Sequence, residues 1–101
     1  MITEDYVSFE TAKLLKEKGF DERVLTFYFP GDIQRPTLQM AMKWLREVYG
    51  LFIRITEDMT GNVFEWSVYQ KNYGCKASTY VEDSYEKACE AAIKFCLENL
   101  V

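Results

Sequence analysis

Hydrophobic residues recur every three or four positions in three segments of the chain, which is the pattern of an amphipathic helix. The first segment follows Ser8, a helix-capping residue, and stops at Gly19 behind a basic last turn. The second follows Thr37 and stops at Gly50. Each is predicted to be a helix that buries one stripe. The expected buried residues are Phe9, Ala12, Leu14 and Leu15 in the first helix and Leu38, Ala41, Met42, Leu45, Val48 and Tyr49 in the second.

The third helical segment runs from about Ser84 to Asn99. Asp83 or Ser84 is its expected N-cap, and Asp83 with Glu86 three residues later resembles a capping box. The small residues among its apolar positions would let this helix lie close to a sheet. Its expected core stripe is Tyr85, Ala88, Cys89, Ala92, Cys96 and Leu100, and its expected solvent-facing residues are Glu86, Lys87, Glu90, Lys94 and Glu98.

Between the second and third helices the hydrophobic period changes to two, which is typical of strands. Three strands are predicted, over residues 51–56, 63–69 and 75–81, with turn signals at Gly61-Asn62 and Asn72-Tyr73-Gly74. Connections this short favour an antiparallel meander, because parallel strands need a long crossover. The residues expected beneath the helices are Leu51, Ile53, Ile55, Phe64, Trp66 and Val68, and Cys75, Ala77 and Thr79 share one side of the last strand.

Residues 24–29 form a further run rich in branched and aromatic side chains, and residues 30–36 are expected to be a loop. The run is a candidate fourth strand. The predicted order is therefore α-β-α-β-β-β-α, which is an α+β fold with helices packed on an antiparallel sheet. We find no repeat, low-complexity tract or linker, so residues 1–101 are predicted to form a single domain.

Composition and charge exclude several classes of function. The 101 residues are 49% hydrophobic and carry a net charge of −4, a balance that argues against generic nucleic-acid or anionic-membrane binding. No apolar run is long enough to cross a membrane. The acidic N-terminus lacks the features of a secretory signal. Cys75, Cys89 and Cys96 are interpreted as buried thiols in a reducing compartment, so the expected location is the cytoplasm.

Catalytic chemistry has little support in the sequence. The chain has no histidine, which excludes Ser-His-Asp and Cys-His nucleophiles and histidine-ligated metals built from this chain alone. The adjacent carboxylates Glu57-Asp58 and Glu82-Asp83 are interpreted as turn and capping residues, and Cys75 has only Lys71 or Lys76 to lower its pKa. We therefore predict that the protein is not an enzyme and holds no cofactor or metal.

The outward side of the predicted meander is the best candidate for a ligand-binding face. If each strand keeps its register, period-two alternation places cations and aromatic rings together there, a combination that suits bases, phosphates or an acidic peptide. The candidate residues are Arg54, Tyr69, Lys71, Lys76 and Tyr80. The alternative is that the first helix or residues 24–29 cover this side, in which case the aromatic rings belong to a core.

Met40 and Trp44 lie beside the core stripe of the second helix, four residues apart. Such a pair is either an extension of the core towards the first helix, the favoured reading, or a docking site. An acidic chain without catalytic motifs is compatible with binding another protein, and a protein partner of unknown identity is the preferred function. Single-stranded nucleic acid bound on the open sheet side is the alternative.

Three segments together resemble an uncharacterised family of small proteins from gut-dwelling anaerobic bacteria and their phages or other mobile elements. They are EDYVSFETAKLLKEKGFDE (residues 4–22), PTLQMAMKWLREV (36–48) and SYEKACEAAIKFCLENL (84–100), about half of the chain. The resemblance lies in the three helical segments and leaves out the sheet. It implies a prophage or mobile-element setting and no activity.

Overall fold

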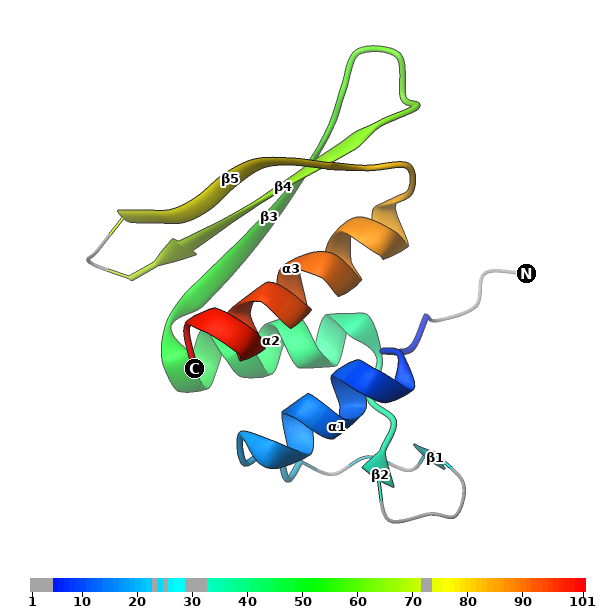
Figure 1. Cartoon of the computed structure of the whole chain (residues 1–101), viewed down its shortest axis with the longest axis vertical. Helices are drawn as coiled ribbons and strands as arrows, with labels where there is room; N and C mark the ends of the chain where they lie inside the picture. The colour runs from blue at the N-terminus through cyan, green and yellow to red at the C-terminus, as the bar shows by residue number, and fades with distance from the viewer. Residues whose placement is uncertain (1–4, 23, 25, 29–32, 72–73) are drawn as a thin grey trace.

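A computed structural model of the chain describes residues 5–22, 24, 26–28, 33–71 and 74–101, while the side chains of 77–80 lie outside the description. The elements are α1 (Phe9–Glu17), β1 (Phe27–Tyr28), β2 (Ile33–Gln34), α2 (Leu38–Tyr49), β3 (Leu51–Glu57), β4 (Phe64–Gln70), β5 (Gly74–Glu82) and α3 (Tyr85–Asn99). This order confirms the predicted α+β class and the three helices. Figure 1 shows α3 lying along the β3-β4-β5 sheet.

The sheet is the predicted antiparallel meander, with strand order β3-β4-β5. The β3–β4 ladder is regular from Leu51 opposite Gln70 to Glu57 opposite Phe64. The β4–β5 ladder is not, because its register shifts on both sides of Val68. These irregularities break the period-two alternation that the sequence analysis assumed for the last strand.

The described residues of the run 24–29 do not add a strand to this sheet. Within the described part of that run, only β1 is a strand, and it pairs antiparallel with β2 as a separate two-stranded sheet. The expectation that 30–36 is entirely loop is therefore wrong at β2, while residues 29–32 lie outside the description. Arg35 N–H donates to Thr26 O at 2.9 Å, and Thr26 Oγ1 donates to Arg35 O at 2.6 Å, so the short ladder extends into the flanking residues.

Each helix begins at a hydroxyl side chain that accepts a backbone N–H of the first turn. Ser8 caps α1, Thr37 caps α2 and Ser84 caps α3, with donor–acceptor distances of 3.1–3.2 Å. Asp83 is therefore not the cap of α3; its carboxylate instead lies 3.0 Å from Lys87 Nζ. Gly50 ends α2 with φ +67°, a left-handed conformation that glycine adopts readily.

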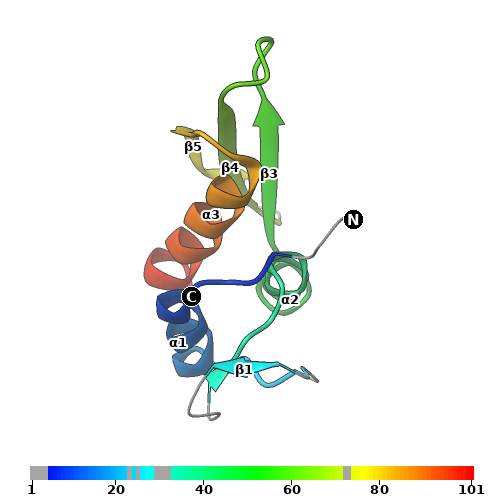
Figure 2. The same ribbon diagram turned by 90° about the vertical axis from the view of Figure 1, so that its right-hand side faces the viewer.

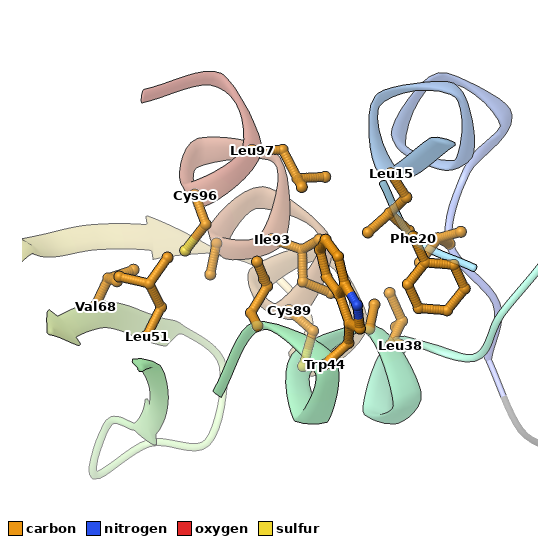
Figure 3. Packing of buried hydrophobic residues seen from close by; sticks show 14 of the residues in the cluster. Leu15, Phe20, Leu38, Trp44, Leu51, Val68, Cys89, Ile93, Cys96 and Leu97 are labelled. Atoms are coloured by element: carbon orange, nitrogen blue, oxygen red, sulfur yellow. The ribbon is translucent and has the colours of Figure 1, made fainter. Parts of the chain in front are cut away.

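The core lies on both sides of α3. Cys96 lies near Leu51 and Val68 of the sheet, whereas Leu97 is on the side of Leu15 in α1 (Figure 3). Ile93, like Leu97, is fully buried although it is absent from the predicted stripe. The predicted core stripe of α3 omits these two residues because it assumes burial on one side of the helix. α3 packs against the sheet on one side and against α1 and α2 on another, as Figures 1 and 2 show. The core expected at Leu45, Trp66, Ala92 and Cys96 is confirmed.

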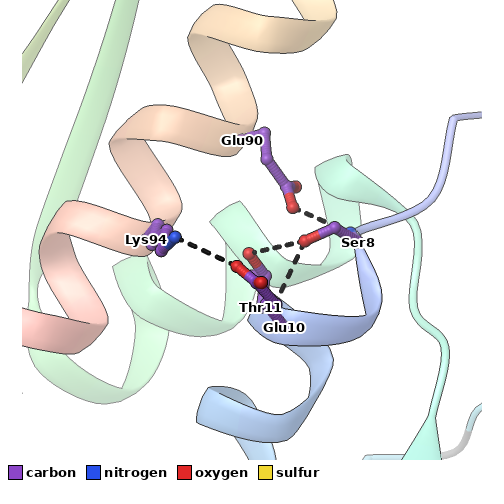
Figure 4. A network of polar contacts seen from close by, with 5 residues as sticks. All are labelled: Ser8, Glu10, Thr11, Glu90 and Lys94. Atoms are coloured by element: carbon purple, nitrogen blue, oxygen red, sulfur yellow. Dashed lines mark hydrogen bonds and ion pairs between the residues drawn. The ribbon is translucent and has the colours of Figure 1, made fainter.

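Two residues predicted to face solvent on α3 instead contact α1. The Glu90 carboxylate accepts the Ser8 N–H at 2.8 Å, and Lys94 Nζ lies 3.3 Å from the Glu10 carboxylate (Figure 4). A carboxylate beside the first N–H groups of a helix is favourable, because the helix end carries partial positive charge. These contacts link the two ends of the chain, since Ser8 and Glu90 are 82 residues apart.

Three further positions differ from the predicted stripes. Phe9 and Val48 are 43% and 55% exposed, and Tyr85 at the start of α3 is 39% exposed. A fourth position, Thr11, was not expected in the core but is fully buried, and its hydroxyl accepts a hydrogen bond from Ser8 Oγ. Tertiary packing decides which side of each helix is buried. Residue spacing alone therefore does not predict the burial of residues at the edge of an apolar stripe.

Candidate binding face

The sheet has one side that faces away from the helices, formed by alternate residues of β3, β4 and β5. The backbone register places Phe52, Tyr69 and Cys75 opposite one another, Arg54 opposite Ser67, and Glu65 between Thr56 and Val81. Directly opposed residues share a side of a sheet. We call this set the open face; its members are Phe52, Arg54, Thr56, Glu65, Ser67, Tyr69, Cys75 and Val81.

Within the described part of the chain, no helix and no β1–β2 strand covers the open face. The contacts of α3 are with the other side, where its Phe95 ring packs 5.6 Å from Trp66. α1 lies beyond α3 and contacts β2, and Figure 2 shows it separated from the sheet by α3. Phe52 and Val81 are 41% and 52% exposed as a result. The alternative in which α1 or residues 24–29 bury this side is wrong for the described residues.

Arg54 and Tyr69 lie together on the open face, as predicted. The Arg54 guanidinium carbon is 5.3 Å from the centre of the Tyr69 ring. The contact is diagonal across the ladder, since Arg54 pairs with Ser67 and Tyr69 with Phe52. A guanidinium over an aromatic face within about 6 Å is a cation–π contact, worth about 0.5–1 kcal/mol at an exposed site. It holds the Arg54 charge over the Tyr69 ring, and the backbone of Tyr69 pairs opposite Phe52.

The two predicted lysines lie at the end of the face where β4 turns into β5. Lys71 is exposed and follows directly after β4, with its backbone N–H donating to Gly50 O at 2.8 Å. Lys76 is exposed in β5, at the point where the register shifts between Val68 and Tyr69. Both cations are therefore close along the chain to Tyr69, which the Arg54 side chain also contacts.

The last predicted residue of the site, Tyr80, is placed only through its backbone, which pairs opposite Trp66 in the β4–β5 ladder. Its side chain lies outside the described residues. Its predicted place beside Lys76 relied on an unbroken alternation, and β5 does not keep one. The same shift sets Cys75 opposite Tyr69 and leaves it exposed, so the prediction that Cys75 is a buried thiol is wrong.

The open face is electrically polarised along the strands. Arg54 lies at the middle of the β3–β4 ladder, and Lys71 and Lys76 lie near the β4–β5 turn, whereas Glu65 lies towards the β3–β4 turn, where Asp58 follows. Phe52 and Val81 add exposed apolar surface to these two ends. Sequence reasoning left Phe52 out of the site residues although its alternation with Ile53 placed it on the outward side. Unbroken alternation through residues 75–81 placed Val81 on the other side, and the register shifts in β5 bring it to the open face.

The buried cysteines have environments that suppress thiolate formation. Burial raises the pKa of Cys89 to about 11 and that of Cys96 to about 12. Both side chains are fully buried, which confirms their predicted role as small core residues. A thiol that stays protonated is a poor nucleophile, so the two cysteines have no chemical part in a binding site.

The turn role predicted for Glu57-Asp58 is confirmed at Asp58, whereas the capping role predicted for Glu82-Asp83 is wrong, because Ser84 caps α3. The Asp58 carboxylate accepts hydrogen bonds from the Thr60 and Gly61 N–H groups and from the Thr60 hydroxyl at 2.9–3.2 Å. Desolvation acts to raise the pKa of Asp58, but these hydrogen bonds to the ionised form outweigh it and lower the pKa. Asp58 thus fixes the β3–β4 turn, and Asp83 pairs with Lys87.

A second concave region adjoins α2. Trp44 is only 6% exposed, with its ring edge-on to Phe20 and Tyr49 at 5.3 Å, which confirms the core interpretation of Trp44. Met40 is 38% exposed and borders, with Trp44, a hollow of about 240 Å³. The other lining residues are Glu22, Lys43 and Glu47. These three side chains carry charges of both signs, so the hollow has no strong preference for the charge of a ligand.

Among the described residues, no helix is long and apolar enough to span a bilayer, and no group of three metal-ligating side chains converges. Comparison with models of protein families, with curated proteins and with solved structures finds no match to this chain.

Proposed function

We propose that the protein is a non-catalytic binding module that holds an extended, acidic segment of a partner protein on its open face. The observation that carries the proposal is the Arg54–Tyr69 contact, on a side of the sheet that no described helix or strand covers, in an otherwise acidic chain. A fixed guanidinium with Lys71 and Lys76 near by attracts carboxylates. Phe52 and Val81 supply the apolar surface that protein interfaces use at their centre.

Single-stranded nucleic acid is the second candidate, because aromatic rings set among cations are also what such ligands bind. The protein partner is favoured on two counts. Single-strand binders stack successive bases on several rings, whereas Tyr69 is half-buried and has Arg54 over its ring, which leaves Phe52 as the one well-exposed ring among the described open-face residues. The open face also presents Phe52 and Val81 as exposed apolar surface, which a protein segment can bury and a phosphate backbone cannot.

The test compares two probes on one surface. A synthetic peptide that alternates Glu with Leu represents the acidic segment, and labelled oligo(dT) represents the nucleic acid, each titrated at low salt and again at physiological salt. The double variant Arg54→Ala/Lys71→Ala removes two cations from the face. Lys43→Ala/Arg46→Ala removes the same charge from exposed positions of α2 and is the matched control.

We expect the peptide to bind the wild type and the α2 control alike, and to bind the open-face variant about tenfold or more weakly, since each lost charge-assisted contact costs about 1.5 kcal/mol or more. Tighter binding of oligo(dT) than of the peptide, weakened by the same variant, would make the second candidate the function. Equal loss in both double variants would show that net charge alone governs binding and would contradict the proposal.

The setting inferred from the resemblance, a phage or other mobile element, stays a prediction, as does the cytoplasmic location. Both are compatible with a small module that acts by binding. Oxidation of Cys75 on the open face is a simple check on the location, because a reducing compartment keeps an exposed thiol reduced. Recovery of Cys75 as a mixed disulfide from cells would contradict a reducing location.

A further inference from the structure

The outer edge of β3 presents backbone groups that are unpaired within the described part of the chain. Lys71 N–H donates to Gly50 O at 2.8 Å, and Asp58 N–H donates to Val63 O at 3.0 Å, so even-numbered residues of this strand bond to β4. In an antiparallel ladder, alternate residues direct their N–H and C=O groups to opposite edges. The odd-numbered residues of β3 therefore direct theirs away from β4, and no described strand pairs with them there.

Only part of this edge is accessible. Leu51 is 0% exposed, so its backbone groups are not accessible to another strand. Ile53 and Ile55 are partly exposed and Glu57 is exposed. The accessible donors and acceptors are thus those of residues 53, 55 and 57. This set is symmetric about Ile55.

The two edges of the sheet differ in regularity. The β3–β4 register is unbroken over seven pairs, so β3 offers an even row of backbone groups. β5, at the opposite edge, has register shifts on both sides of Val68. Bulges of this kind twist an edge and discourage pairing with another strand, and natural sheets use them for that purpose. A further strand would therefore add at β3.

We propose that a second copy of this chain pairs antiparallel with the β3 edge, around a two-fold axis at Ile55. Ile55 then lies opposite Ile55 of the second copy, and Ile53 opposite its Glu57, in both directions. Each accessible edge residue finds a partner, and the result is a continuous six-stranded sheet built from two three-stranded ones. A two-fold contact of this kind closes on itself, so it forms a dimer and not a fibre.

Charge on the open face selects this register and this occupant. A two-fold axis at Arg54 would set the two Arg54 side chains directly opposite each other, which destabilises a ladder. The axis at Ile55 sets Arg54 opposite the neutral Thr56 of the second copy and diagonal to its Asp58, two residues further along the strand. The antiparallel arrangement also brings the basic end of one open face beside the acidic end of the other. The inference uses backbone groups at the edge and does not rest on the proposed function.

Amide hydrogen exchange on the wild-type protein tests the pairing residue by residue. With rising protein concentration, the amides of Ile53, Ile55 and Glu57 should become at least about tenfold better protected, while light scattering reports a dimer. The amides of Arg54 and Thr56 bond to β4 in either state and are the internal control. A monomer at every concentration, or a dimer whose added protection lies elsewhere, would overturn the proposal.

A pair of variants gives an independent check. Ile55→Pro removes the outward N–H, which the β3–β4 ladder does not use, and proline is tolerated at strand edges for that reason. Ile55→Ala loses the same apolar packing but keeps the N–H. We expect Ile55→Ala to dimerise and Ile55→Pro to stay monomeric. Dimerisation of both would contradict the proposed contact, and the exchange measurement decides if Ile55→Pro does not fold.

Discussion

The two sides of the β3-β4-β5 sheet come from the same strands and differ in what covers them. The inner side holds Val68 and Trp66 at 0% and 4% exposure beneath α3, while the open face leaves Phe52 and Val81 41% and 52% exposed. The open face is also where the Arg54 guanidinium lies over an aromatic ring. Alternate residues thus have separate tasks, and stability and binding should respond to different substitutions on one strand.

That separation is expected because burial supplies the largest favourable term in folding, and the inner side provides nearly all of it for the sheet. Contacts on the open face are exposed to water and contribute little to the folded state. The open face is therefore free to carry charges and aromatic rings that would be costly inside.

The sharpest contrast is between two aromatic residues of β4. Trp66→Ala should lower the free energy of unfolding by about 3–5 kcal/mol, because it leaves a cavity under α3. Tyr69→Ala, three residues along and on the open face, should cost about 1 kcal/mol. Urea denaturation of both variants measures the difference. An equal loss in the free energy of unfolding for both variants would show that the two sides of the sheet contribute equally to stability.

Overpacking the same inner side gives the next effect. Ala92 is fully buried on α3, and its small side chain lets the helix approach the sheet. Ala92→Leu should cost about 1–3 kcal/mol, because the added atoms displace the helix or force strained side chains. Ala91→Leu, at a half-buried position, is the control and should cost less. Unchanged stability for Ala92→Leu in urea melts would show that the packing of α3 is looser than described.

The contrast between the buried and the exposed side should also appear in the reactivity of the three thiols and in the pH dependence of stability. Cys75 should react quickly with an alkylating reagent, whereas Cys89 and Cys96 should react only on unfolding. The folded-state pKa of each buried thiol, about 11 and about 12, lies above the unfolded value of about 8.5. The folded state then binds more protons than the unfolded state above pH 8.5, so stability is full below that pH and falls as pH rises.

For Cys96 the slope should approach about 1.4 kcal/mol per pH unit between about pH 9 and the folded pKa. Denaturation midpoints measured across that range test the slope, and Cys96→Ala should flatten it. Rapid labelling of Cys89 or Cys96 in the folded protein, or a stability that is constant to pH 11, would contradict their burial.

The smallest effect on stability belongs to the binding residues. Arg54→Ala/Lys71→Ala should change the free energy of unfolding by about 1 kcal/mol or less, since exposed cation–π contacts and surface charges contribute little. The same variant should lose affinity for an acidic peptide and show a flatter salt dependence. A variant that unfolds readily would place Arg54 in the stability of the sheet and would remove the division between the two sides.

Local signals predicted most of this arrangement. The cap Ser8, the stop at Gly50 and the alternation through β3 and β4 depend on neighbours close in sequence, and all are confirmed. The alternation also places the side chains of Arg54 and Tyr69 on the same side of the sheet, where they contact each other. Such features follow from backbone geometry within a few residues, so spacing alone is enough to find them.

What the sequence did not predict depends on distant contacts. Glu90 meets Ser8 of α1 and Leu97 packs towards Leu15, because α3 has neighbours on two sides, and no spacing rule within α3 signals this. The register shifts in β5 placed Cys75 on the open face and separated Tyr80 from the predicted set. No feature of the β5 sequence signals these register shifts, and a prediction from the sequence therefore assumes unbroken alternation along the strand.

The central claim is that the open face is where this protein binds, and chemical-shift mapping tests it most directly. The isotope-labelled protein is titrated at low salt with the alternating Glu-Leu peptide, and the backbone amides that move are assigned. We expect the largest shifts at Phe52, Arg54, Ser67 and Tyr69, with the amides of α1 and α3 unchanged. Shifts centred on the Met40 hollow beside α2, or no shifts up to millimolar peptide, would contradict the claim.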